Sequence, residues 1–291
     1  MNDYLLTLIL GIVEGLTEFL PVSSTAHLRI SQALLGMDLS DGFWKMFAIV
    51  IQIGPILCLP IFFRHRIAVW FATFPGGTRG DRTAVTHPLT LTLVAFVFTA
   101  VPALLLKKLI SKHLEDLKLI AITMIAGGIV MWIVDAVAGR NSGTTSESGA
   151  AQEVEEMGLG RAIWIGLCQA VSGIFPGTSR SMATIAGAQI CGLSRTAALE
   201  FSFLLSIPTM AAATGYDLLK ALKPGNGEVP LHIDSHGWVL LLLGASISFI
   251  VAYMVVVWFM NWVRRRGFVP FAIYRLIMGA AVLVWVLNSA K

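Results

Sequence analysis

The apolar residues of the chain gather into long runs that are separated by short polar stretches. The runs do not alternate apolar and polar positions with a period of two, so they favour helices over the strands of a transmembrane barrel. Six of them approach the roughly 20 apolar residues that a helix needs to cross a bilayer. These six predicted spans cover residues 43–63, 89–106, 119–138, 197–219, 237–262 and 268–288.

Two further apolar runs, residues 4–35 and 161–193, are interrupted by Pro21 and Pro176. Each arm is too short to cross a bilayer, so we expect each run to form a re-entrant hairpin, two short helices that enter the membrane and return to the same side. Three predicted crossings separate the two hairpins. Because three is an odd number, the hairpins should enter from opposite sides, and their tips should meet near the membrane centre.

The two interrupted runs repeat one plan at a constant spacing. Four positions of the first run recur 155 residues later, namely Gly11 as Gly166, Glu14 as Gln169, Pro21 as Pro176 and Ser24 as Ser179. Interrupted segments at corresponding places in two halves point to a binding site in the middle of the membrane. The sequence therefore predicts one all-α polytopic membrane domain, residues 1–291, made of two inverted repeats at residues 1–138 and 161–291. Each repeat should hold one re-entrant hairpin and three transmembrane helices.

The connections between the runs are polar. Residues 64–88 are expected to form a polar loop, residues 107–118 a charged connector, and residues 139–160 a disordered loop that is rich in Gly, Ser and Glu. More basic residues fall on one side of the predicted membrane (Arg64, Arg66, Arg79, Arg82, Arg140, Arg161 and Arg264–Arg266) than on the other (Lys107, Lys108, Lys112, Lys220 and Lys223). This bias favours a cytoplasmic arginine side and an N-terminus outside.

Polar and helix-breaking residues also occur inside the spans. A kink is expected in the first span near Gln52, Gly54 and Pro55, with Pro208 as the counterpart of that proline in the second repeat. Asp135 lies near the end of the third span, and we expect its side chain to reach toward the membrane surface.

Composition supports the membrane assignment. The chain is 56% hydrophobic and 13% charged, against roughly 25% charged in soluble domains. The early apolar run lacks a basic start and carries two glutamates, so it is not expected to be a cleaved signal peptide. The net charge of +4 suits contact with anionic membrane lipid and gives no reason to expect nucleic acid. The three cysteines lack the spacing of metal ligands and are predicted to be small core residues.

Two carboxylates mark the first hairpin. Glu14 and Glu18 are four residues apart, so they share one helical face among apolar neighbours. Ionisable residues are costly inside a membrane, so the pair predicts a functional site. Past Pro21 the hydroxyl residues Ser23, Ser24 and Thr25 favour a new helix start, whose free N–H groups attract an anion such as phosphate, and His27 follows on the first turn. Plain helix capping by Ser24 and a satisfied core histidine remain open alternatives.

The second tip offers another helix start and an arginine. Arg180 is suited to gripping phosphate through two hydrogen bonds. Gly177 would let a ligand approach the backbone, and Thr178, Ser179, Ser181 and Thr184 supply hydroxyls. An ion pair between Arg180 and Glu14 or Glu18 is the structural alternative, and it is compatible with phosphate binding.

The two tips together pose an electrostatic conflict. Two helix starts and an arginine attract a phosphate group, whereas two carboxylates beside them would repel it. A divalent cation, Mg²⁺ or Ca²⁺, held by Glu14 and Glu18 would resolve the conflict, since both ions take oxygen ligands from carboxylates and phosphates. The pattern therefore predicts a metal-dependent site for a membrane-embedded phosphate or diphosphate.

Four segments carry a family resemblance. EGLTEFLPVSSTAHL (14–28) and PGTSRSMAT (176–184) resemble the two signature motifs of the undecaprenyl-diphosphatase family, the bacitracin-resistance phosphatases of bacterial inner membranes. FSFLLSIPTM (201–210) and FVPFAIYR (268–275) are also similar to that family, and only the loop at 139–160 departs from it. The resemblance implies an enzyme that removes the terminal phosphate of undecaprenyl diphosphate and so recycles the lipid carrier for peptidoglycan synthesis.

The resemblance also implies roles and a location. Glu14 and Glu18 match the family's acidic pair, Ser24 and His27 its catalytic serine and histidine, and Ser179, Arg180 and Thr184 its pyrophosphate-binding residues. The family depends on a metal and acts at the outer face of the inner membrane.

The sequence leaves some alternatives open. Ser24 could attack phosphorus after giving its proton to His27 or a glutamate, or a metal-activated water could attack instead. A lipid-phosphate flippase or transporter is the rival class, because inverted repeats with broken helices also build carriers. The small pair Gly127-Gly128 would allow helices to pack closely, including those of a homodimer.

Overall fold

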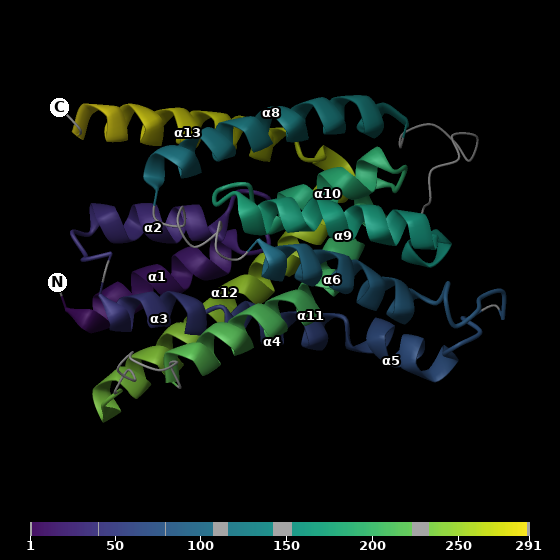
Figure 1. Cartoon of the computed structure of the whole chain (residues 1–291), viewed down its shortest axis with the longest axis horizontal. Coiled ribbons are helices and arrows are strands. Elements are labelled where there is room, and N and C mark those ends of the chain that lie inside the picture. The colour runs from purple at the N-terminus through teal and green to yellow at the C-terminus, as the bar shows by residue number, and fades with distance from the viewer. Residues whose placement is uncertain are drawn as a thin grey trace.

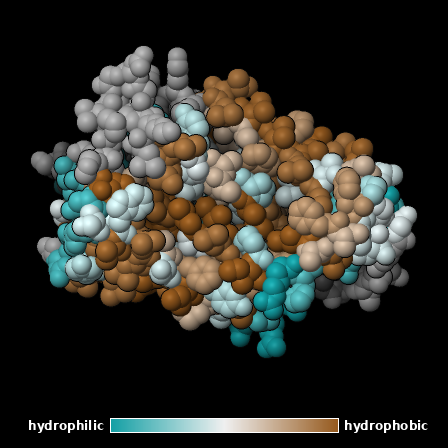
Figure 2. Space-filling model, turned by 90° about the horizontal axis from the view of Figure 1, so that it is seen from below, coloured by the Kyte–Doolittle hydropathy of each residue, from teal (hydrophilic) through white to brown (hydrophobic). Residues whose placement is uncertain are grey.

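A computed structural model of the chain describes residues 2–39, 41–78, 80–106, 116–141, 153–222 and 233–289. Within these ranges every regular element is a helix, as predicted. Six segments are long and apolar enough to cross a membrane: Gly42–Phe62, Pro88–Leu105, Leu117–Ala138, Arg195–Lys220, Ser235–Arg266 and Val269–Asn288. They match the six predicted spans to within a few residues, so the chain is a multi-pass membrane protein. Figure 2 shows apolar side chains over most of one face, with hydrophilic ones at its left edge and lower right.

The long helices pack roughly along one axis. Helices α8 (Leu117–Asn141) and α13 (Val269–Ser289) lie against each other at one edge of the molecule (Figure 1). Helix α6 (Pro88–Leu105) lies near the middle of the molecule, and α11 (Arg195–Leu222) packs against both α6 and α12 (Ser235–Arg266) (Figure 1).

Four shorter helices form the two hairpins. Helices α1 (Asp3–Thr17) and α2 (Ser24–Leu34) form the first, and α9 (Leu159–Ile174) and α10 (Arg180–Ile190) form the second. The longest has 16 residues, or about 24 Å, which is short of the roughly 30 Å hydrocarbon core. The tips touch, because the Ser181 hydroxyl donates to the Leu20 carbonyl at 2.9 Å. The prediction that the two tips meet is therefore confirmed.

The first span is kinked, as predicted. It consists of α3 (Gly42–Val50) and α4 (Ile53–Phe62), separated by a break of two residues. The Ser248 hydroxyl of α12 donates to the Ile51 carbonyl at 2.6 Å and so satisfies a backbone group that the break frees. Gly54 lets the broken helix lie against α12, since a Cβ there would overlap Ser248. Pro208, by contrast, lies inside the unbroken helix α11.

The prediction of a polar loop at residues 64–88 is partly wrong, because the first part of this segment is helix α5 (Arg64–Thr73). One face of α5 turns inward, where Trp70 is buried and donates to Glu155 at 2.9 Å. Arg66 binds the same glutamate at 2.7 Å and also lies 2.7 Å from Glu200 of α11. These contacts, which no local pattern encodes, hold α5 against the helix bundle.

The prediction of a disordered loop at residues 139–160 is wrong at both ends of this segment, which are the parts that the structure describes. Helix α8 continues to Asn141, and the turn of 3₁₀-helix η1 (Val154–Glu156) buries Val154 and Met157 in the core. Residues 142–152 lie outside the described residues, as do residues 107–115 of the charged connector.

The expectation that Asp135 reaches the membrane surface is also wrong. Its side chain is fully buried and accepts from Arg195 Nε at 2.8 Å, from the Phe268 N–H at 2.9 Å and from Gln189 Nε2 at 3.3 Å. A buried carboxylate with an arginine and two further donors is a satisfied group. It ties α8 to the starts of α11 and α13, so its role is structural.

Replacing Asp135 by alanine should destabilise the fold strongly. The change leaves the Phe268 N–H and the Arg195 guanidinium without their acceptor, which we expect to cost about 3 kcal/mol of unfolding free energy. Thermal unfolding of purified protein in detergent measures this, with the exposed Asp3→Ala as the control. Equal melting temperatures for the two variants would show that Asp135 does not stabilise the fold.

Candidate active site

The two tips share an unusual backbone geometry. Ser23 is the N-cap of α2 and Ser179 the N-cap of α10, and their side chains accept from the N–H groups of Ala26 and Met182 at 3.4 and 3.3 Å. Both serines have positive φ, 75° and 73°, and they are the non-glycine residues of the described part that do so. Such a backbone is strained for a residue with a side chain and often marks a functional site.

The shared caps correct the register of the repeat. Ser23 and Ser179 are structural equivalents and lie 156 residues apart, whereas the sequence pairs Ser24 with Ser179 at 155. The second tip therefore holds one more residue before its cap. Ser24 and Arg180 become the first residues of their helices, so each tip presents its chemical group at the same structural position.

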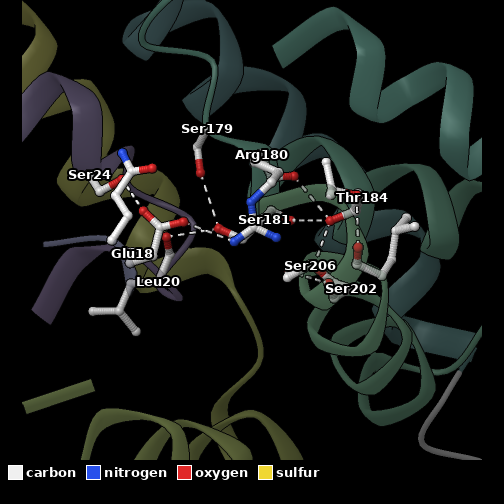
Figure 3. A network of polar contacts seen from close by, with 12 residues as sticks. Glu18, Leu20, Ser24, Ser179, Arg180, Ser181, Thr184, Ser202 and Ser206 are labelled. Atoms are coloured by element: carbon white, nitrogen blue, oxygen red, sulfur yellow. Dashed lines mark hydrogen bonds and ion pairs between the residues drawn. The ribbon is translucent and has the colours of Figure 1, made fainter. Parts of the chain in front are cut away.

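Glu18 lies at the centre of the site and joins the two tips. Its Oε2 accepts a short hydrogen bond from the Ser24 hydroxyl, and its Oε1 accepts from Arg180 Nη2 at 3.0 Å (Figure 3). The Glu18 and Arg180 side chains are 7% and 16% exposed, so the ion pair is largely shielded from solvent. The ion pair considered from the sequence is present, and it leaves Arg180 Nη1 without a protein partner in the described residues.

Glu14 lies one helical turn before Glu18 and is fully buried. Neither of its carboxylate oxygens has a hydrogen-bond partner among the described residues. An isolated buried carboxylate is costly unless it is protonated or coordinates a cation. These free oxygens beside Glu18 fit a divalent cation. No three His, Cys, Asp or Glu side chains of the described residues lie close enough together to hold a metal ion. The ligands available here are therefore the two carboxylates of Glu14 and Glu18.

His27 is held away from Ser24. Its Nδ1 lies 2.7 Å from the Ser23 carbonyl, its Nε2 lies 2.7 Å from the Tyr274 hydroxyl, and its ring stacks on Tyr274. A carbonyl only accepts, so Nδ1 carries a proton, and in the neutral ring Nε2 accepts from the Tyr274 hydroxyl. Of the two bases considered for Ser24, Glu18 is therefore the one in hydrogen-bond contact with its hydroxyl.

Arg275 is a site residue that the sequence analysis did not single out. It is fully buried in α13 and donates to the carbonyls of Pro21 at 3.1 Å, Gly177 at 3.0 Å and Thr123 at 3.3 Å. It thus holds both tips and α8 together through one guanidinium. The sequence did contain a signal for this residue, because Arg275 is an arginine inside the last predicted span, next to Tyr274. Gly127 makes room for it, since a Cβ there would overlap Arg275 Nη2, so the small pair of α8 packs within the chain.

A cavity of about 320 Å³ opens beside the tips. It is lined by tip residues predicted from the sequence: Glu18, Ser23, Ser24, Thr25, Gly177, Ser179 and Arg180. Polar residues of other helices that the sequence analysis did not assign to the site complete its wall: Gln52, Thr99, Gln169, Ser172 and Thr209. The repeat pairs Gln169 with Glu14, but no motif assigns these five residues to a site, because the helices that carry them meet only in the folded chain.

Other predicted site residues lie behind the cavity wall. Ser181 bonds to Leu20 and to Ser179, while the fully buried Thr184 donates to the Arg180 carbonyl at 3.0 Å and contacts the Ser202 hydroxyl (Figure 3). Thr178 faces an apolar groove between α8, α9 and α10. Ser181 and Thr184 therefore brace the second tip, and none of these three residues lines the cavity.

Fold and site together define a multi-pass membrane protein with an acid–serine–arginine cavity where two short helical hairpins meet. The chain belongs to the bacitracin resistance protein BacA family, whose sequence model matches residues 7–281. It is 60% identical to the undecaprenyl-diphosphatase of Koribacter versatilis over 99% of this chain and all of that protein. It is 42% identical to the undecaprenyl-diphosphatase of Thermus thermophilus over 94% of each. The chain is accordingly an enzyme, a membrane hydrolase.

Replacing Arg275 by methionine should loosen the junction of the two tips. The carbonyls of Pro21 and Gly177 would lose a charged donor inside the protein, which we expect to cost about 2–4 kcal/mol of unfolding free energy. Thermal unfolding in detergent measures the loss, and the exposed Arg265→Met serves as the control. A variant that melts with the wild type would show that Arg275 does not hold the tips.

Proposed function

We propose that the chain hydrolyses undecaprenyl diphosphate to undecaprenyl phosphate and inorganic phosphate. One observation carries the proposal: Glu18 binds Ser24 of one tip and Arg180 of the other beside a cavity that all three residues line. A carboxylate base, a hydroxyl and a guanidinium in contact are the groups that phosphoryl transfer needs. The shared name of the relatives supports the choice of substrate.

The diphosphate binds at the two helix starts. The N-termini of α2 and α10 carry partial positive charge and free N–H groups, and Arg180 Nη1 is available as a further donor. Gly177 lines the cavity, and its missing side chain leaves room for Ile120 and Thr123 of α8. Because these donors are fixed by the fold, they need little rearrangement when charge builds up on the phosphate.

Glu18 is the general base of this mechanism. In one route Glu18 Oε2 takes the Ser24 proton while Ser24 Oγ bonds to the terminal phosphorus. The bridging P–O bond breaks, the lipid monophosphate leaves, and water then cleaves the phosphoserine. In the other route Ser24 only binds phosphate and Glu18 activates a water. The hydrogen bond that the Ser24 hydroxyl donates to Glu18 supports the first route, because it places the base next to the hydroxyl.

A divalent cation, Mg²⁺ or Ca²⁺, completes the site. Glu14 and Glu18 would hold it together with phosphate oxygens of the substrate. When bound, it would neutralise charge on the diphosphate. The two unpartnered oxygens of Glu14 support this assignment, since a cation would compensate a buried carboxylate that otherwise has no partner in the described residues.

The protein works in the bacterial inner membrane, with its cavity open to the outer face. The cavity-lining Ala103 lies near the end of the membrane-spanning helix α6, and this end is remote from the cluster around Arg66. The arginine-rich end is assigned to the cytoplasm. In this orientation the enzyme would return the lipid carrier for cell-wall synthesis and so confer resistance to bacitracin.

Three substitutions test the reaction. Glu18→Gln, Ser24→Ala and Arg180→Ala should each lower phosphate release from a long-chain prenyl diphosphate by about 100-fold or more. The first variant removes the general base, the second the nucleophile, and the third the guanidinium that binds phosphate. Release is measured on purified protein in detergent, with the exposed Ser246→Ala as the control. A Ser24→Ala variant that keeps most of its activity would establish attack by water. A folded wild type that binds the lipid but releases no phosphate would point to a carrier.

Metal removal tests the role of Glu14. A chelator should abolish phosphate release, and added Mg²⁺ or Ca²⁺ should restore it. Glu14→Gln should raise the metal concentration that gives half-maximal activity by tenfold or more, because one anionic ligand is lost. Undiminished activity in chelator would refute the metal site. An unchanged metal requirement in Glu14→Gln would exclude Glu14 as a ligand.

A further inference from the structure

Gln169 is a buried amide without a partner. It lies on α9, is 1% exposed, and neither its Nε2 nor its Oε1 forms a hydrogen bond within the described residues. A buried amide that finds no partner costs stability. The other glutamines of the described part have partners: Gln32 accepts from Arg29, Gln52 from Thr214, and Gln189 donates to Asp135.

The cavity wall around Gln169 does not offer it a partner. Thr99 donates to the carbonyls of Ala95 and Gly166, Thr209 to that of Leu205, and Ser172 to the backbone carbonyl of Gln169 itself. These hydroxyl protons are all committed to backbone groups. The amide lines the same cavity as Arg180, whose Nη1 is also free. Two unpaired donors thus border the same cavity.

The position of Gln169 in the repeat explains why it is an amide. It corresponds to Glu14 of the first half, which carries two unpaired carboxylate oxygens. A third carboxylate beside Glu14 and Glu18 would repel an anionic ligand. An amide of the same shape gives N–H donors without adding negative charge. The two halves thus supply opposite functions at equivalent positions, an anion in the first and a neutral donor in the second.

We propose that Gln169 is a substrate-binding residue whose Nε2 donates to a non-bridging oxygen of the diphosphate group. The assignment rests on the proposed function, because it takes the diphosphate as the occupant of the cavity. The hydrogen-bond partner that Gln169 lacks in the protein is then an oxygen of the bound diphosphate. The free protein bears the cost of an unpaired amide, and the complex recovers it.

This role predicts opposite effects on binding and stability. Gln169→Met replaces the amide by an apolar side chain of similar size, so it should raise KM for a long-chain prenyl diphosphate about tenfold or more. Its melting temperature should stay equal to that of the wild type or rise, because an unpaired polar group is removed. Gln169→Glu should bind more weakly than Gln169→Met, since it adds charge.

The matched control is Gln189→Met, which replaces a buried glutamine that has a partner outside the cavity. It should lower the melting temperature and leave KM unchanged. Inorganic pyrophosphate with Mg²⁺ serves as a headgroup probe without a lipid tail. It should raise the melting temperature of the wild type and of Gln189→Met, and raise that of Gln169→Met much less.

The outcomes separate this assignment from the proposed function. An unchanged KM and an unchanged pyrophosphate response in Gln169→Met would overturn the assignment, even if the wild type is active. A melting temperature that falls as in Gln189→Met, with unchanged KM, would show a structural role instead. If the wild type released no phosphate, the proposed function would fail. The pyrophosphate-induced shift would still decide whether Gln169 binds a diphosphate.

Discussion

The site depends on one shielded carboxylate that binds two groups at once. Glu18 accepts from Ser24 on its own hairpin and from Arg180 on the other. In surroundings of low dielectric such a pair is retained only when its hydrogen bonds are well formed, because either charge alone would be costly. The contact therefore fixes the distance between the tips and keeps the base next to the hydroxyl. Assembly of the fold and assembly of the site are one event.

Several contacts share the work of holding that junction. Arg275 binds carbonyls of both tips, Ser181 bonds across to Leu20, and Thr123 donates to the Pro176 carbonyl. Broken helices at membrane depth are tolerated where protein groups satisfy the freed backbone, and these residues supply such groups. The strained backbone of the two capping serines persists because the surrounding contacts hold it. Polar residues at the junction of the two tips thus hold the structure together and line the cavity.

The described helices agree closely with the prediction because hydrophobic length is a local property. The six spans, the two short hairpins and the kink near Gln52 follow from apolar runs and from the residues that interrupt them. The errors arose where a polar residue finds its partner far along the chain. Asp135 is paired by Arg195, and Arg66 and Trp70 are paired by Glu155, so a predicted surface aspartate and a predicted loop proved to be ordered structure.

The sequence alone determined the class of the molecule, the two tips and the tip residues that line the cavity. Motifs specify Glu18, Ser24 and Arg180 because these residues stand at breaks in apolar helices, and such breaks can be recognised locally. Only the tertiary structure decided that Ser24 bonds to Glu18, that His27 turns to Tyr274, and that Arg275 and Gln169 join the site. The physical reason is that a hydrogen bond depends on distance and direction, and helix packing sets both between residues that are remote in the chain.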